Sequence, residues 1–270
     1  RGLSAARNFA LDNMDPATEY VSFLDSDDWM EPDAVHTLCR AAEEEGADLV
    51  SCDYYIIADG KDKRPAFPSD SKVVLTGEER LIRFINRDRL NSMPWNKLYK
   101  SALFSDVRLP EDKYFGDSAV VYRLIDLAEK VVLIPDILFD YRIRESSLTF
   151  NYSAKRLIDR WDVHLQRYKF LSALVTDEAC IRILEGDCLV SIERMWKSWK
   201  NFGPEDRRLA KPCLEEMNRF ASERRGRVLR ERGYKKFHKL ICLLAVFKDP
   251  RFVVPLLSTA FAVFNFLKKR

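Results

Sequence analysis

At 270 residues, the chain is long enough to bury one hydrophobic core, or one core and a smaller second unit. Its 47% hydrophobic and 32% charged residues are typical of a folded soluble protein, and its net charge of +3 excludes the strongly basic surface of a nucleic-acid-binding protein. The six cysteines form no CxxC pair and the three histidines are widely spaced, so we expect reduced cysteines and no zinc site.

Residues 1–13 predict a helix, because the segment is rich in alanine and Ser4 can cap its start. Arg7 and Asn8 lie near that start, where a guanidinium and main-chain N–H groups can hold a phosphate. The alternative for Arg7 is an ordinary surface arginine.

Residues 20–25 predict a buried strand, since a β-branched and aromatic run ends abruptly at acidic residues. This strand delivers Asp25, Asp27 and Asp28 to its carboxyl end, which is where open α/β sheets bind ligands. Asp25 and Asp27 can share Mg²⁺ or Mn²⁺ with a phosphate, because both ions prefer oxygen ligands. The alternative is an acidic turn that caps the next helix.

A helix is predicted over 32–45 and a strand over 47–57. With the strand at 20–25 they make a strand–helix–strand unit, which predicts a parallel sheet. Two further strands, 131–134 and 138–142, are predicted on either side of a Pro-Asp pair.

A second acidic loop, residues 109–118, leads into a helix predicted over 118–129, with Asp117 at its N-cap. Because a helix N-terminus favours negative charge, we expect the pKa of the Asp117 carboxyl to be lowered and the group to be ionised at neutral pH. The alternative is that Asp117 only caps the helix.

The segment after Tyr141 places two guanidiniums on one face of an extended chain and then two hydroxyls. Such a set can clamp a diphosphate, and the alternative is an exposed basic edge strand. The residues of this predicted clamp are Arg142, Arg144, Ser146 and Ser147.

Strand-like runs disappear after residue 150, and helical periodicity covers the chain to about residue 225, where Trp161, Trp196 and Trp199 are expected to pack in a core. We therefore predict three regions, 1–150, 151–248 and 249–270.

Residues 252–267 are apolar and flanked by basic stretches, but shorter than the roughly 20 residues of a spanning helix, so we expect this tail to lie on a membrane surface. The alternative is a helix docked on the protein itself or on a partner.

Four segments in this order and spacing resemble the family 2 inverting glycosyltransferases of the GT-A fold, especially those that build bacterial cell-surface polysaccharide or teichoic acid. The resemblance covers roughly residues 1–150. The segments are Gly2–Asn8, Phe23–Trp29 with Glu31–Asp33, Trp95–Tyr99, and Tyr141–Thr149.

The resemblance implies a mostly parallel α/β sheet with helices on both faces, followed by an all-helical region. It implies that Asp25 contacts the nucleotide sugar, that Asp27 holds Mn²⁺ or Mg²⁺ on its diphosphate, and that Asp117 is the general base. Arg142 and Arg144 would neutralise the leaving diphosphate with help from Ser146 and Ser147. The family usually places a glutamate before the base, whereas this chain has Gly116.

The family also begins with a strand, a helix and a second strand that carry much of the nucleotide pocket. We expect these to be missing upstream of residue 1. The implied function is transfer of a sugar to a cell-envelope glycan or a lipid-linked acceptor at the inner face of the plasma membrane. The alternatives are a nucleotidyltransferase and a truncated, non-catalytic relative that acts as a binding module.

Overall fold

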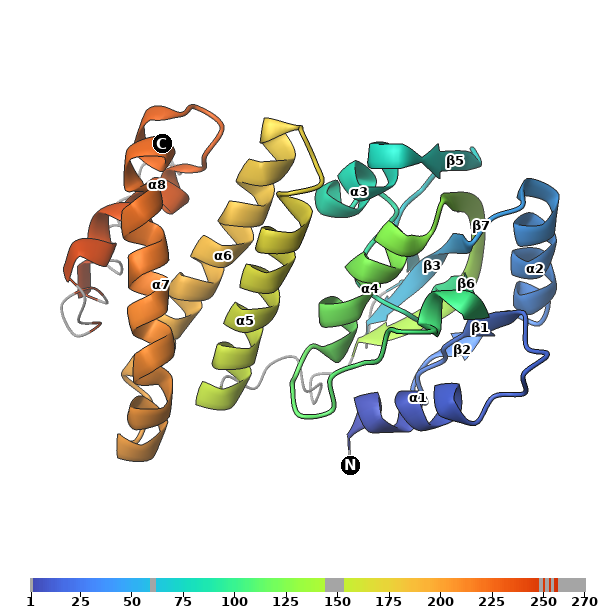
Figure 1. The fold of residues 1–270 in the computed structure, drawn as a ribbon, viewed down its shortest axis with the longest axis horizontal. Coiled ribbons are helices and arrows are strands. Elements are labelled where there is room, and N and C mark those ends of the chain that lie inside the picture. The colour runs from blue at the N-terminus through green and yellow to red at the C-terminus, as the bar shows by residue number, and fades with distance from the viewer. Residues whose placement is uncertain are drawn as a thin grey trace. The chain divides into compact units, whose positions relative to one another are not determined.

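The strands of the N-terminal unit form one mixed sheet, and helices cover both of its faces (Figure 1). The computed structural model describes residues 2–58, 62–143, 153–247, 250, 253 and 255–256. By its contacts the chain divides into two units, Arg1–Phe150 and Asn151–Arg270. The elements of the first unit are α1 (Leu3–Asp12), β1 (Tyr20–Ser22), β2 (Trp29–Met30), α2 (Ala34–Glu45), β3 (Leu49–Ala58), β4 (Arg64–Pro65), β5 (Val73–Thr76), α3 (Gly77–Asn86), β6 (Lys97–Lys100), η1 (Ser101–Phe104), α4 (Gly116–Leu127) and β7 (Lys130–Ile143).

The sheet has the strand order β1-β6-β3-β7-β2, with β4 paired to β3 and β5 paired to β7. Among the described strands, only the central pair β3–β7 is parallel, so the predicted predominance of parallel pairs is wrong. Strands β1 and β3 do point the same way, because each is antiparallel to β6, which lies between them. The α/β class itself is confirmed.

Strand β7 is continuous from Lys130 to Ile143, whereas the sequence predicted two strands separated by Pro135. The register against β3 shifts on either side of Asp53, opposite this proline. A bulge of this kind accommodates a residue that cannot donate to the ladder, which explains why one strand runs through it.

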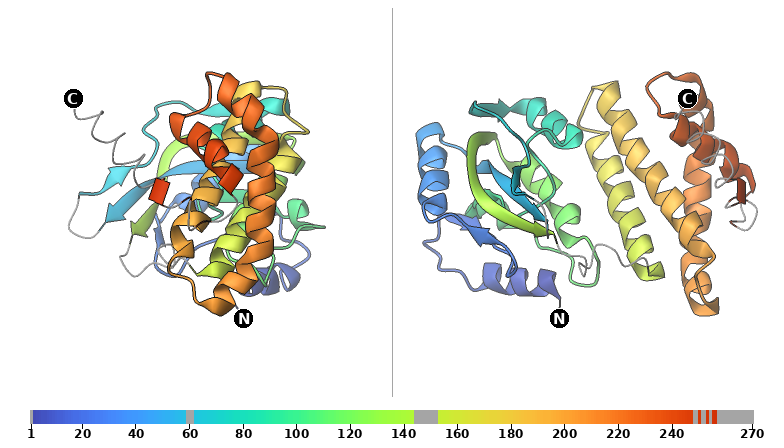
Figure 2. Two further views of the ribbon diagram at one scale, coloured as in Figure 1. Left: turned by 90° about the vertical axis from the view of Figure 1, so that its left-hand side faces the viewer. Right: turned by 180° about the vertical axis from the view of Figure 1, so that it is seen from behind.

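Helix α2 covers one face of the sheet, and α3 and α4 lie on the other side, as both ribbon views from front and back show (Figures 1 and 2). The apolar face of α2 places Leu38 and Ala42 against Val50 and Phe139 of the two central strands. Gly46 ends this helix in the left-handed conformation that glycine adopts without strain. The predicted cover of helices on both faces is confirmed.

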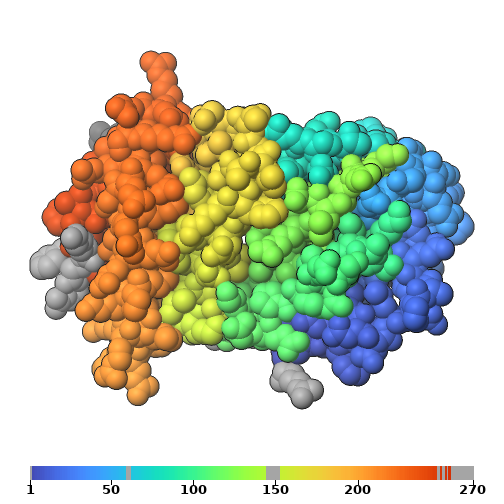
Figure 3. All heavy atoms as spheres, in the orientation of Figure 1, coloured from blue at the N-terminus to red at the C-terminus, as the bar shows by residue number. Residues whose placement is uncertain are grey.

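The second unit is helical, as predicted. Its core contains the fully buried Trp161 and Trp196, with Trp199 packed against it, and Trp161 donates to Glu216 over 2.7 Å. In Figure 3 the side chains of the first two helices (yellow) and of the third (orange) form a continuous surface. The elements are α5 (Ala154–Leu171), α6 (Glu178–Trp199), α7 (Pro204–Arg230), α8 (Lys236–Leu244) and η3 (Ala245–Phe247).

All six cysteines are free thiols, and four of them, Cys52, Cys180, Cys188 and Cys242, are buried. Within the part of the chain that the structure describes, no helix is both long and apolar enough to cross a membrane. Most of the predicted membrane-binding tail, 249–270, lies outside the described residues.

Candidate active site

The acidic segment after β1 is a tight turn held against β7. The main-chain N–H of Asp28 donates to the carbonyl of Asp25 over 3.1 Å, and the buried Asp28 carboxylate accepts from the Arg142 main-chain N–H over 2.9 Å. Asp28 therefore fixes the turn in place, a role that the sequence did not indicate. Asp25 and Asp27 remain partly exposed on this fixed support.

Arg7 reaches from α1 to this turn. Its guanidinium donates to Asp25 over 2.5 Å and lies 5.5 Å from the centre of the Phe23 ring. The side chain is only 8% exposed, so the ion pair is sheltered from water and stronger than a surface pair. Arg7 thus sets the orientation of Asp25.

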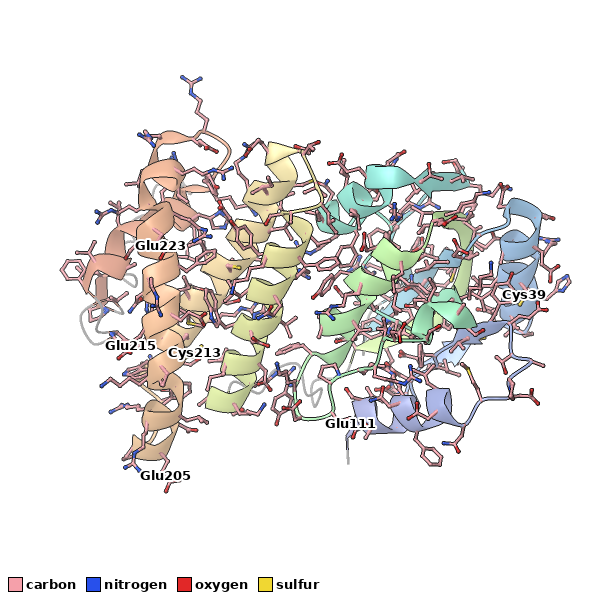
Figure 4. All side chains as sticks on the ribbon, in the orientation of Figure 1. Cys39, Glu111, Glu205, Cys213, Glu215 and Glu223 are labelled. Carbon is pink, nitrogen blue, oxygen red and sulfur yellow. The ribbon has the colours of Figure 1, made fainter. Side chains whose placement is uncertain are left out.

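Asn8 connects α1 to the second acidic loop. Its amide nitrogen donates to the Leu109 carbonyl over 2.8 Å and to Glu111 over 3.1 Å, and its amide oxygen accepts from the Leu109 N–H over 2.9 Å. Glu111 lies on that loop near α1 in Figure 4. Both polar atoms of Asn8 are therefore used within the protein, and the contacts position the loop that leads to Asp117.

Asp117 lies in the first turn of α4, one residue after Gly116, and not at the N-cap as predicted. The N-cap is Phe115, which has the left-handed backbone φ of 62° that is uncommon for a non-glycine residue. The Asp117 carboxylate accepts from the Ser118 N–H over 2.7 Å. The unusual backbone at Phe115 turns the loop sharply into the helix and so brings Asp117 to the site.

Burial raises the pKa of the Asp117 carboxyl, and the nearby charge of Asp25 raises it further. The Ser118 N–H and the Arg7 guanidinium act in the opposite direction but do not cancel this effect. The predicted lowering of the pKa is therefore wrong, because the loss of hydration outweighs the helix N-terminus. A carboxylate with a raised pKa is a stronger base, which suits proton abstraction.

Gly116, where the family usually has a glutamate, lies close to α1. A Cβ at this position would lie 2.4 Å from the Oγ of Ser4 and 3.4 Å from the Pro110 carbonyl. Ser4 lies inside α1, whose N-cap is Gly2, so the predicted capping role of Ser4 is also wrong. Helix α1 and the start of α4 thus approach each other at a point where only a glycine fits without a shift.

Replacement of Gly116 by alanine is expected to lower the free energy of unfolding by about 1–3 kcal/mol, as overpacking does. Adding Ser4→Ala should recover most of the loss, because it removes the clashing oxygen. Thermal or urea unfolding of the two single variants and the double variant measures the coupling. If the two substitutions change the free energy of unfolding in a strictly additive way, Ser4 rotates away from the new Cβ without cost.

Tyr141 of β7 shows that the acidic residues converge. Burial is the first cause of the raised pKa of its hydroxyl, followed by the charges of Asp28, Asp27, Asp25 and Asp117. The fold therefore brings four carboxylates from two distant loops within electrostatic reach of one partly buried tyrosine. The sequence predicted three of them as site residues but gave Asp28 and Tyr141 no role of their own.

The predicted diphosphate clamp is only partly described. Arg142 is exposed near the end of β7, and its main-chain N–H holds Asp28. Arg144, Ser146 and Ser147 lie outside the described residues. Their proximity to the acidic turn stays a prediction.

The carboxylate oxygens of the acidic turn are suitable ligands for a divalent ion that is shared with a substrate. Asp25 binds Arg7 and Asp28 binds the main chain of β7, and among the described residues no three His, Cys, Asp or Glu side chains form a metal-binding group. Mg²⁺ and Mn²⁺ commonly take one or two protein carboxylates and complete their shell with water and phosphate oxygens. Asp27 belongs to the same turn and carries a carboxylate of the kind that such an ion takes.

Comparison with known proteins finds sequence similarity mainly in the N-terminal region. The sequence model of the family described as glycosyl transferase family 2 matches residues 1–108. Glycosyltransferase GlyA of Streptococcus pneumoniae serotype 4 (strain ATCC BAA-334 / TIGR4) is 32% identical over 178 residues, which cover 63% of this chain and 25% of GlyA. Glycosyltransferase GlyG of the same strain is 32% identical over 138 residues, covering 48% of this chain and 46% of GlyG. The chain thus spans less than half the length of either relative.

Among solved structures, the fold is similar to that of S. aureus TarS 1–349 crystallised with UDP-GlcNAc. The TM-score is 0.58 at 16% sequence identity, over 91% of this chain and 68% of that one. The TarS 1–349 complex with UDP gives a TM-score of 0.60. At this identity the likeness shows the fold alone. The N-terminal region of this chain, residues 1–108, is thus similar in sequence to the glycosyl transferase family 2 model, and the chain shares its fold with solved structures of TarS.

Proposed function

We propose that the protein transfers a sugar from a nucleotide-sugar donor to a cell-envelope glycan or lipid-linked acceptor, with inversion and with the help of a divalent metal. The observation that carries this proposal is the acidic turn of Asp25, Asp27 and Asp28, held on β7 through Asp28, with the carboxylate of Asp117 within electrostatic reach of Asp25. It combines a fixed acidic turn for a metal-bound diphosphate with a separate carboxylate for proton transfer.

In the proposed reaction, Asp117 accepts the proton of the acceptor hydroxyl. The acceptor oxygen forms a bond to the anomeric carbon while the bond from that carbon to the diphosphate oxygen breaks on the opposite face. The raised pKa of Asp117 favours this proton transfer, provided that the group is ionised when substrate binds. A single in-line displacement inverts the configuration at the anomeric carbon.

Asp25, oriented by Arg7, is proposed to contact the nucleotide sugar. Asp27 would hold Mn²⁺ or Mg²⁺, which when bound supplies positive charge to the departing diphosphate. Arg142 and Arg144, with Ser146 and Ser147, would bind the same diphosphate, and an arginine fork suits its paired oxygens.

A uridine nucleotide is the proposed donor class, because TarS, which shares the fold, was crystallised with UDP and with UDP-GlcNAc. The test is release of UDP from a panel of UDP-sugars by the full-length protein, with Mn²⁺ and with EDTA. Release that needs Mn²⁺ and is faster with one sugar supports the proposal. No release from any donor, together with no binding of UDP, would favour a non-catalytic binding module.

We also propose that the tail holds the protein on the inner face of the plasma membrane, a proposal that rests on the sequence alone. Residues 252–267 are apolar, and basic residues at 224–239 and 268–270 flank them. The protein should sediment with anionic vesicles, less so as salt rises, and a version ending at Lys248 should not. Equal sedimentation of both versions would contradict the proposal.

A further inference from the structure

Lys97 is a fully buried lysine in β6, an inner strand of the sheet between β1 and β3. A buried amine loses its hydration and is tolerated only where its donors find acceptors. Each of the three N–H donors of the Lys97 amine has an acceptor. The Nζ atom donates to the Met93 carbonyl over 2.6 Å, to the Asn96 side-chain oxygen over 2.7 Å and to the Asn91 side-chain oxygen over 3.2 Å.

These acceptors belong to one segment, residues 91–96, and this segment is also bonded to β3. Asn96 donates to the Cys52 carbonyl over 2.7 Å. The side-chain oxygen of Asn91 also accepts from the Met93 N–H over 3.0 Å. Lys97 is thus the centre of a buried polar cluster that fixes a segment without regular secondary structure.

The segment carries Trp95, and Trp95 supports Tyr141. The two rings are stacked, with centres 5.2 Å apart and planes inclined by 15°, while Tyr54 packs edge-on against Trp95 at 4.7 Å. Tyr141 precedes Arg142, whose main-chain N–H holds the Asp28 carboxylate of the acidic turn over 2.9 Å. A path of direct contacts therefore leads from Lys97 through residues 91–96 and Trp95 to Tyr141.

A purely structural role would not require a lysine. An apolar side chain of similar length fills the same volume without loss of hydration, and such replacements of buried charges are often neutral or stabilising. What a lysine adds is three directed bonds to one segment. Burial acts to lower the pKa of Lys97 and the charge of Asp117 acts against this, so the amine is within electrostatic reach of the candidate base.

We propose that Lys97 is a positioning residue of the active site, which fixes residues 91–96 and through the Trp95 ring holds Tyr141 and the adjoining part of β7 that binds Asp28. The catalytic consequence rests on the proposed glycosyl transfer, whereas the positioning itself does not. Lys97→Met keeps the length of the side chain and removes its three donors. Lys100→Met is the matched control, because Lys100 lies on the same strand and is exposed, with an ion pair to Asp48.

The first readout is ¹⁹F NMR of protein labelled with 5-fluorotryptophan, whose five signals include Trp95, assigned by Trp95→Phe. Lys97→Met should move or broaden the Trp95 signal and leave those of Trp161 and Trp196 unchanged, whereas Lys100→Met should change none of these three. An unchanged Trp95 signal in folded Lys97→Met would overturn the proposal. If Lys97→Met does not fold, Asn91→Ala, which removes one acceptor, should move the same signal by a smaller amount, and no movement there would equally overturn it.

The second readout is turnover of the UDP-sugar that the release assay identifies. A small misplacement of reacting groups lowers kcat by about tenfold or more, so Lys97→Met should lower kcat to this extent while the KM for the donor changes less than twofold. Unchanged kcat with a shifted Trp95 signal would remove the catalytic part of the proposal. Failure of the wild-type protein to bind UDP would refute the proposed function, and the NMR result would still decide the positioning role.

Discussion

Asp117→Asn is expected to lower turnover by about 10²-fold or more, in line with the loss of a general base. The asparagine side chain has nearly the same shape and can still accept from the Ser118 N–H, so α4 should keep its first turn. UDP affinity should hardly change, because Asp117 is proposed to act on the acceptor hydroxyl and not on the nucleotide. Single-turnover rates and UDP titrations of the full-length protein measure the two effects separately.

Asp106→Asn is the control for this variant, since Asp106 is an exposed residue in the loop between η1 and α4. The wild-type rate should also fall as the pH drops through the pKa of Asp117, because only the ionised carboxylate accepts a proton. That pKa is raised, so the loss should begin at a higher pH than for an exposed aspartate. Weakened UDP binding with normal residual turnover would show that Asp117 has a structural role.

Asp27→Asn is expected to abolish Mn²⁺-dependent turnover and to remove the effect of Mn²⁺ on UDP binding. A neutral amide is a weaker ligand than a carboxylate for a hard divalent ion, and the site has few protein ligands to spare. The turn itself should persist, because it is held by Asp28 on the main chain of β7 and by Arg7 on Asp25. Calorimetric titration of UDP with and without Mn²⁺ gives the comparison.

Asp33→Asn provides a matched control, because Asp33 is exposed before α2 and its side chain makes no capping hydrogen bond there. Its metal dependence should equal that of the wild-type protein. Full Mn²⁺-dependent activity in Asp27→Asn would refute the assignment of Asp27 as the metal ligand.

The position of the acidic turn could be predicted from the sequence because it depends on a local pattern. An apolar run that stops at several carboxylates indicates the end of a strand whatever its neighbours are. The partners of that strand could not be predicted in the same way. The alternation of side chains says which face is buried, but not that β6 inserts antiparallel between β1 and β3.

Electrostatic properties were the least predictable part of the site. The helix N-terminus was a correct local argument for Asp117, but the pKa depends on burial by distant parts of the chain. The same is true of Lys97, whose three acceptors come from a segment with no periodic signal. Tyr141 could be assigned a role only after the fold had brought the two acidic loops to it.

The configuration of the transferred sugar tests the central claim most directly. With the α-linked UDP-sugar identified by the release assay and Mn²⁺ present, ¹H NMR of the product at early times reports the anomeric configuration. One carboxylate base and a single in-line displacement predict a β product. An α product would contradict the account, because retention requires a different mechanism from the one built on Asp117.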